Sequence, residues 1–112
     1  MTAREKAILV AKALDDKKAQ DIKVLDIGSL TSIGDYFVIA SGTSVPQVKA
    51  LCDEVDEKLS AQGEEPRRRE GYQTAAWVLL DYSDVVVHLF LKDTREFYGL
   101  ERLWADAVEL EI

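Results

Sequence analysis

Few side chains in this sequence are of the types that carry out nucleophilic, redox or metal chemistry. Its 112 residues include a single histidine, His88, and a single cysteine, Cys52. Zinc sites draw their ligands from closely spaced histidines, cysteines and carboxylates, and no such spacing occurs around these two residues. Cys52 falls in the apolar stripe of a predicted helix, where burial makes a thiol unreactive. The sequence therefore predicts no metal site, no cofactor and no nucleophilic catalysis.

One turn has the composition of a phosphate-binding loop. Residues 41–44 read Ser-Gly-Thr-Ser and lie between a predicted strand and a predicted helix. Backbone N–H groups at such a turn can bind phosphate, and nucleotidyltransferases combine the turn with metal-binding carboxylates, commonly an Asp-x-Asp pair on a strand. No such pair occurs near the following strands. The pattern favours an ordinary capped turn from Gly42 to Ser44, and a nucleotidyltransferase-like, nucleotide-binding enzyme is the alternative function.

The net charge narrows the class of partner. Fourteen basic residues stand against twenty-one carboxylates, which gives a formal charge of −7. Proteins that bind nucleic acid through its phosphates present basic stripes. Here only the run Arg67, Arg68 and Arg69 is suited to a minor RNA contact, so little direct RNA binding is expected. An acidic surface favours approach to a basic protein, although the same charge also serves simple solubility.

The hydrophobic pattern predicts a single α/β domain over residues 1–112. Helices are expected over residues 2–18, 44–62 and from 93 to about 107. Each begins with a capping pair, at Thr2/Glu5, Ser44/Gln47 and Asp93/Glu96. Strands are expected over residues 22–27, 36–41, 64–71, 75–81 and 84–91. The order αββαβββα indicates a mixed five-stranded sheet with helices mainly on one face, and residues 108–112 are either a short strand or a loose acidic tail.

Nothing in the sequence marks a membrane or secreted protein. No apolar stretch approaches the roughly 20 residues that span a bilayer. The first residues, Met-Thr-Ala-Arg-Glu-Lys, lack the apolar core of a signal peptide. A lone cysteine cannot form an internal disulfide, which agrees with a reducing compartment. We therefore expect a cytoplasmic protein.

Strands 75–81 and 84–91 are predicted to form a hairpin through Tyr82 and Ser83, with Trp77 opposite His88. Alternation places only aliphatic side chains on one face of this hairpin, beneath the helices. The other face carries aromatic, aliphatic and polar side chains: Trp77, Leu79, Asp81, Val86, His88 and Phe90. Three helices are too few to cover both faces, so this second face is a candidate contact patch. The alternative is that a terminal segment covers it and Trp77 belongs to the core.

Several motifs together resemble the ribosomal silencing factor family, RsfS, also called iojap. They are residues 35–42 with Ser44 and Gln47, residues 70–71, 76–82, 85–90 and 95–98, and residues 100–101 and 103–104. The resemblance runs from the first helix to Trp104. It implies a nucleotidyltransferase-like fold without the catalytic carboxylates. It also implies a non-enzymatic repressor of translation that acts under nutrient limitation.

The resemblance further implies a partner, the large-subunit ribosomal protein uL14. Family members bind it at the face where the small subunit docks and so prevent the subunits from joining. Carried over to this sequence, the implied contact residues are Trp77, Leu79, Asp81, Tyr82, His88, Phe90 and Tyr98. The chain has no transit peptide, which implies a bacterial cytoplasmic member. A homodimer that buries the Trp77 face against itself is a further alternative.

Overall fold

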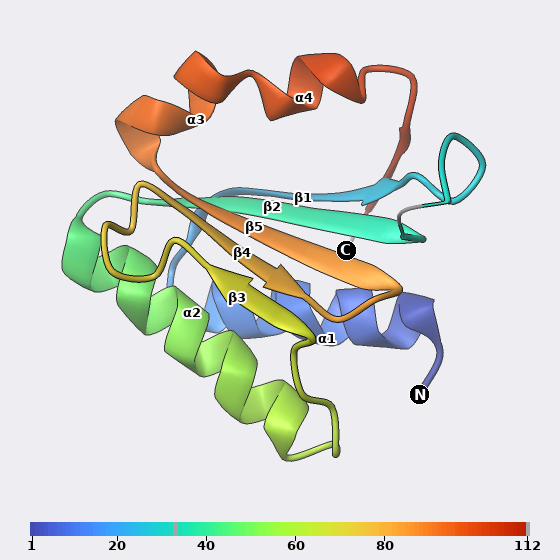
Figure 1. Ribbon diagram of the computed structural model, residues 1–112, viewed down its shortest axis with the longest axis horizontal. Helices are drawn as coiled ribbons and strands as arrows, with labels where there is room; N and C mark the ends of the chain where they lie inside the picture. The colour runs from blue at the N-terminus through green and yellow to red at the C-terminus, as the bar shows by residue number, and fades with distance from the viewer. Residues whose placement is uncertain (33, 112) are drawn as a thin grey trace.

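A six-stranded mixed sheet separates two layers of helices (Figure 1). The computed structural model describes residues 1–32 and 34–111. The strands lie in the order β3-β4-β5-β2-β1-β6, and the β2–β5 pair is parallel while the other pairs are antiparallel. Their bounds are β1 Gln20–Asp26, β2 Tyr36–Gly42, β3 Arg68–Glu70, β4 Trp77–Asp81, β5 Val85–Leu91 and β6 Val108–Leu110. The strand expected over residues 64–71 is the short edge strand β3.

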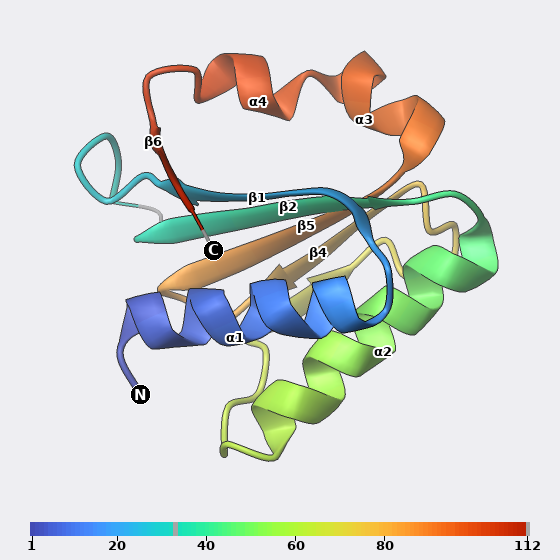
Figure 2. The same ribbon diagram turned by 180° about the vertical axis from the view of Figure 1, so that it is seen from behind.

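The two long helices, α1 (Ala3–Asp16) and α2 (Val45–Ser60), pack side by side on one face of the sheet (Figure 2). The predicted capping box of Thr2 and Glu5 is present in α1. At α2 the Ser44 hydroxyl accepts from the backbone N–H of Gln47, but the Gln47 side chain accepts from the N–H of Thr43 instead of closing the box. In the described part of the chain, every helix is too short or too polar to cross a membrane.

The apolar stripe of α2 forms the centre of the core beneath this face. Leu51, Cys52 and Val55 have no exposed surface and pack against the aliphatic side chains of β4 and β5. Burial raises the pKa of the Cys52 thiol to about 11, so the group is neutral at pH 7. Cys52 is thus a core residue, as the sequence predicts.

Val55→Ala should lower the free energy of unfolding by about 2 kcal/mol, because it removes buried methyl groups and leaves a cavity. Urea unfolding of both proteins measures the difference. Glu57→Ala, at an exposed position of the same helix, is the matched control and should change stability by less than about 0.5 kcal/mol. Equal unfolding midpoints for Val55→Ala and the parent protein would contradict this packing.

The β4–β5 hairpin is paired differently from the prediction. Trp77 lies opposite Phe90, and Leu79 lies opposite His88, so the predicted register is wrong by two residues. The ladder extends past β4, since the Tyr82 N–H donates to the Val85 carbonyl over 2.9 Å, and the turn lies at residues 83–84. Because side chains alternate with a period of two, a shift of two residues leaves every side chain on its predicted face.

The C-terminal segment differs more from the prediction. Residues 108–110 pair with β1, which makes a sixth strand where the sequence predicts five. The single helix expected from residue 93 is two short helices, α3 (Lys92–Tyr98) and α4 (Leu100–Leu103), separated by Gly99 at a φ of 61°. The predicted Asp93 cap makes no side-chain hydrogen bond at the start of α3. The side chain of Phe97, expected on the apolar side of this helix, and Ile112 lie outside what the structure describes.

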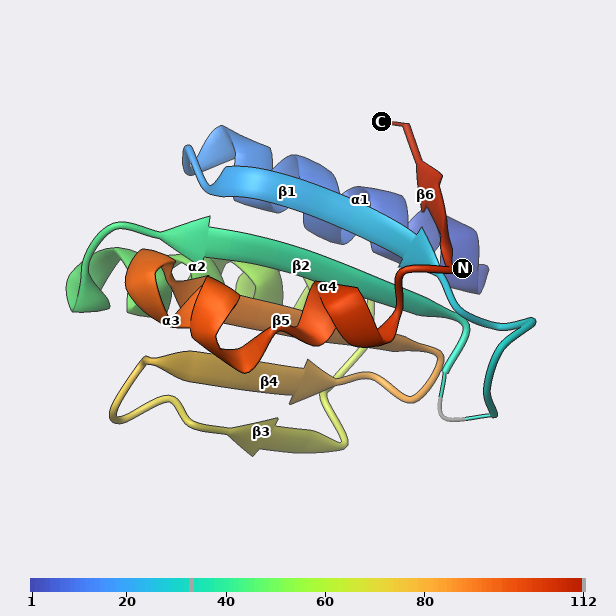
Figure 3. The same ribbon diagram turned by 90° about the horizontal axis from the view of Figure 1, so that it is seen from above.

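The helices α3 and α4 lie across the face of the sheet opposite to α1 and α2 (Figures 1 and 3). Leu100, Trp104 and Ala107 pack there against a second apolar cluster, which consists of Leu25, Ile27, Phe37, Ile39, Val86 and Phe90. The expectation that the helices would leave this face open is therefore wrong for much of its area. The C-terminal segment provides the cover, which is the alternative that the sequence left open.

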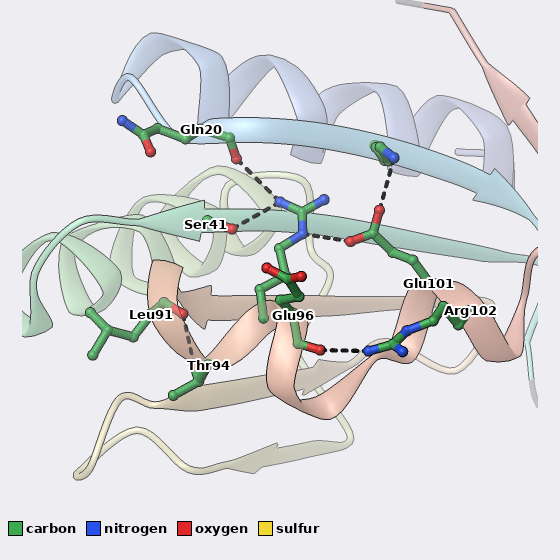
Figure 4. Close-up of polar contacts among 9 residues, drawn as sticks. Gln20, Ser41, Leu91, Thr94, Glu96, Glu101 and Arg102 are labelled. Carbon is green, nitrogen blue, oxygen red and sulfur yellow. Dashed lines mark hydrogen bonds and ion pairs between the residues drawn. The ribbon is translucent and has the colours of Figure 1, made fainter.

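A partly buried polar cluster fastens α3 and α4 to the sheet (Figure 4). The Arg95 Nε donates to Glu101 Oε1 over 2.7 Å, and its Nη1 donates to the buried Ser41 hydroxyl over 2.8 Å. Lys23 Nζ lies 2.8 Å from the other carboxylate oxygen of Glu101. Burial acts to raise the pKa of Glu101, but the hydrogen bonds from Arg95 and Lys23 prevail and hold it below its usual value. Glu101 is thus charged at neutral pH and links β1 to both short helices.

Candidate protein-binding face

The short helices leave part of the second sheet face uncovered. Figure 3 shows their ribbons lying mainly over β5 and β2 and reaching the near edge of β4, while β3 stays clear of them. An open depression of about 390 Å³ lies in this uncovered part. We call it the open face, and it is lined by Ser32, Phe37, Arg67, Arg68, Leu79, Asp81, Ser83, Val86 and His88. Its apolar floor comes from three strands of the sheet, and its polar rim comes from loops and the edge strand.

Aromatic side chains lie beside the open face. The ring of Trp77 stacks on Phe90, with 5.2 Å between centroids, and the ring of Tyr98 from α3 lies 4.8 Å from Trp77. Trp77 is half-buried, and Tyr98 is 46% exposed. We call Trp77 and Tyr98 the aromatic wall. Tyrosine and tryptophan side chains at such positions offer a large contact area at low conformational cost.

His88 lies between the aromatic wall and the open face. Its ring is T-shaped to Phe37 at 4.6 Å, and its Nδ1 accepts a hydrogen bond from the Trp77 indole N–H over 3.1 Å. Burial lowers the pKa of His88 to about 4, so the ring is neutral at pH 7. Because Nδ1 is the acceptor, the proton of the neutral ring is assigned to Nε2. That Nε2 atom is buried and has no hydrogen-bond partner among the described residues.

Asp81 organises the rim at the end of the hairpin. Its Oδ1 accepts from the Ser83 N–H over 2.8 Å, and its Oδ2 accepts from Arg67 at 3.2 Å and from Arg68 at 3.4 Å. Burial acts to raise the pKa of Asp81, but these hydrogen bonds and the Arg67 charge lower it below its usual value. The side chain is only 5% exposed. Asp81 therefore holds the turn and two guanidinium groups in place rather than presenting a free carboxylate.

The basic run is divided between the two faces of the sheet. Arg67 and Arg68 lie on the rim of the open face, whereas Arg69 turns the other way and forms ion pairs with Asp53 and Asp56 of α2. Alternation along the edge strand β3 puts Arg68 and Arg69 on opposite faces, and Arg67 precedes the strand. The run is therefore not one continuous basic stripe.

The structure brings together most, but not all, of the residues that the sequence singles out for partner contact. Trp77, Leu79, Asp81, His88 and Tyr98 line or border the open face. Phe90 has no exposed surface and lies beneath Trp77. Tyr82 is 5% exposed and lies on the opposite face of the sheet, in the core beneath α1 and α2. These last two side chains are core residues and offer no contact surface.

Several lining residues are not among the predicted contact residues, including Phe37, Arg67 and Arg68. Phe37 joins the floor because β2 pairs in parallel with β5, which places it beside Val86. A parallel pairing between strands that are distant in the chain leaves no local sequence signal. From the sequence alone, Arg67 and Arg68 are candidates only for a minor RNA contact. Their position beside a hairpin turn becomes visible only when the edge strand is placed.

The turn at residues 42–44 is an ordinary helix start. A Cβ atom on Gly42 would lie 2.8 Å from a methyl carbon of Val48, so glycine is required there for close packing of β2 against α2. The Ser44 hydroxyl caps α2, and the Thr43 N–H is bound by Gln47. Within residues 1–32 and 34–111, no group of three or more His, Cys, Asp and Glu side chains is placed to hold a metal ion.

Comparison with known proteins gives consistent matches along the chain. The family model described as "Ribosomal silencing factor during starvation" matches residues 1–112. The ribosomal silencing factor RsfS of Halalkalibacterium halodurans is 44% identical over 112 residues, covering 100% of this chain and 96% of that protein. A crystal structure of a Chromobacterium violaceum protein has a TM-score of 0.91 and 41% identity, covering 94% of this chain and 88% of that chain. A mouse protein named "Mitochondrial assembly of ribosomal large subunit protein 1" is 32% identical over 99 residues, covering 86% of this chain and 43% of that protein. The chain therefore belongs to the RsfS family of ribosomal silencing factors.

Proposed function

We propose that this protein represses translation by binding ribosomal protein uL14 on the large subunit through the open face and the aromatic wall. The observation that carries the proposal is the whole-chain match to the ribosomal silencing factors. The name of the mouse relative, which refers to the large ribosomal subunit, supports the choice of subunit. The partner itself, uL14, comes from the family resemblance of the sequence motifs.

The surface has the composition expected of a protein-binding site. Leu79 and the two aromatic side chains of the wall offer an apolar centre, and Arg67 and Arg68 provide a charged rim. Interfaces commonly place such aromatic anchors at their centre with polar groups around them. This part of the sheet is the best available contact surface because the rest of its second face lies under α3 and α4.

The bound protein acts as a steric block. The domain measures 33 × 33 × 24 Å. When it is bound where the small subunit docks, a domain of this thickness occupies the space between the subunits and prevents them from joining. Repression then needs no catalytic step, in agreement with the regulatory names of the relatives.

The proposal is tested by sedimentation with purified ribosomal subunits. The protein should migrate with isolated large subunits, and large subunits loaded with it should form fewer joined ribosomes when small subunits are added. Val45→Arg, at an exposed site on α2 away from the open face, should behave like the parent protein. A protein that stays at the top of the gradient, or one that binds without reducing subunit joining, contradicts the proposed function.

A homodimer through the same face would compete with ribosome binding. Light scattering across a dilution series measures this directly. A dimer that resists dilution and prevents co-sedimentation would assign the open face to self-association instead.

Association with a basic ribosomal protein should slow as salt is added. The net charge of −7 attracts a basic partner, and exposed charges are screened beyond about 8 Å at physiological ionic strength. Stopped-flow association rates should fall by about tenfold or more between low and high salt, with a smaller change in dissociation rate. Equal association rates across this range would rule out electrostatic steering.

A further inference from the structure

The open face has an unused hydrogen-bond donor beneath it. The Nε2–H of His88 is buried and has no acceptor within residues 1–32 and 34–111, although the other ring nitrogen is engaged by Trp77. Buried N–H groups without an acceptor are rare in native proteins, because the lost hydrogen bond to water is not replaced. Such a donor next to an open depression indicates an acceptor that arrives with a ligand.

The polar groups around the depression are also mainly donors. Both carboxylate oxygens of Asp81 already accept hydrogen bonds, from the Ser83 N–H and from Arg67 and Arg68. The two guanidinium groups are more than half exposed and have further N–H donors. Two cations against one carboxylate, with His88 neutral, leave the lining with a net charge of +1. This is a local exception on a protein whose total charge is −7.

We propose that the open face binds a carboxylate-bearing side chain of the partner protein, with its methylene groups on Leu79 and Val86 and its oxygens toward the His88 Nε2–H and the two arginines. The identity of the occupant as a side chain of the partner rests on the proposed function above. The apolar floor fits methylene groups, and the positive rim fits a single negative charge. An RNA phosphate fits less well, because the floor is apolar and the protein as a whole repels nucleic acid.

Access to the His88 donor requires a small movement. Its Nε2 has essentially no exposed surface in the free protein. Leu79 lies opposite His88 in the β4–β5 ladder, on the same face, and is only half-buried. A rotamer change of Leu79 is the movement by which an acceptor reaches the ring, and such changes are fast for side chains that are not fully packed.

The probe for this site is sodium propionate, which carries one carboxylate on a short aliphatic chain. In a titration of the ¹⁵N-labelled full-length protein followed by NMR, the His88 Nε2 and its proton should shift saturably, together with the backbone amides of Leu79 and Val86. Propionamide, which has an acceptor but no charge, should bind more weakly. The double variant Arg67→Gln/Arg68→Gln should weaken propionate binding about tenfold, because hydrogen bonds to a charged group are lost.

Arg69→Gln is the matched control, because this neighbouring arginine lies on the other face of the sheet. It should leave propionate binding unchanged. The proposal is wrong if propionate causes no saturable shift at His88, or if both arginine variants bind it equally. It is also wrong if inorganic phosphate or a single-stranded RNA oligomer shifts His88 while propionate does not, which would assign the site to a nucleic acid. These titrations contain no ribosomes, so their outcome is separate from that of the sedimentation assay.

Discussion

Leu79→Arg should weaken binding to the large ribosomal subunit more than about a hundredfold. The substitution puts a third positive charge on the open face beside Arg67 and Arg68, and it removes the apolar centre of the proposed contact. A long charged side chain in place of Leu79 must also be desolvated in the contact, which costs several kcal/mol, and about 2.7 kcal/mol corresponds to a hundredfold change in Kd. Sedimentation of labelled protein with large subunits at several concentrations measures the loss.

The control for this prediction is Val45→Arg, which makes the same substitution at an exposed site on the opposite layer of the molecule. Both variants should keep a cooperative urea transition. If Leu79→Arg is folded and binds as tightly as Val45→Arg, the contact does not include the open face. Tyr98→Ala then tests the aromatic wall alone, because Tyr98 is 46% exposed.

Two other substitutions at this surface are less suitable as tests of binding. Trp77→Ala removes the ring that stacks on Phe90 and leaves the Nδ1 of His88 without its donor. Asp81→Lys replaces a buried carboxylate that holds the turn at Ser83. Removing one partner of a buried polar pair destabilises the fold, so a loss of ribosome binding by either variant would not by itself locate the contact.

Acidification should destabilise the fold through His88, by about 2 kcal/mol between pH 7 and pH 5 and by about 3 kcal/mol at pH 4. The folded pKa is lowered to about 4 by burial, whereas the ring in the unfolded chain titrates near its ordinary pKa of 6.5. The unfolded chain therefore binds the proton first. The stabilisation is fully present above pH 6.5 and is lost as the pH falls toward 4. Protonation in the folded state would also place two N–H donors, from Trp77 and Nδ1, against each other.

Urea unfolding at a series of pH values measures this dependence, and His88→Gln is the reference. Carboxylates scarcely titrate between pH 7 and pH 5, so the variant should show a nearly flat profile across this range. Equal slopes for the variant and the parent protein would show that His88 is not the responsible group. A flat profile in the parent protein would show that the ring is not held neutral by burial.

The sequence was sufficient for those parts of the fold that have local signals. The capping box of Thr2 and the cap at Ser44 mark the starts of α1 and α2. The continuous apolar run from Tyr36 marks a central strand. The face of each hairpin side chain also follows from alternation alone. The likeness to nucleotidyltransferases and the cytoplasmic location remain predictions.

The remaining features depend on contacts that are distant in the chain. The hairpin register requires knowing that Tyr82 and Val85 extend the ladder, which the turn composition does not reveal. The strand β6 has only three residues, which is too short for an alternating pattern to distinguish a strand from an irregular tail. The cover on the second face is held by Arg95 of α3, which donates to Ser41 of β2 and to Glu101 of α4. The exposed area of the second face is therefore smaller than predicted, and α3 and α4 border it.

The candidate site was predicted in part, for the same physical reasons. Alternation placed Leu79, Asp81 and His88 together, and the structure keeps them together. It could not show that Phe90 lies beneath Trp77, because that depends on the cover from Tyr98 and its helix. Tyr82 was included as part of the hairpin motif, although its parity places it on the opposite face.

The most direct test of the central claim is site-specific photo-crosslinking from the open face. A photoreactive amino acid in place of Leu79 is irradiated with the protein bound to purified large subunits, and the crosslinked partner is identified by mass spectrometry. We predict one dominant product with uL14, which disappears when unlabelled parent protein is added in excess. Crosslinks to ribosomal RNA, to another ribosomal protein or to a second copy of this chain, without a product containing uL14, would contradict the proposal.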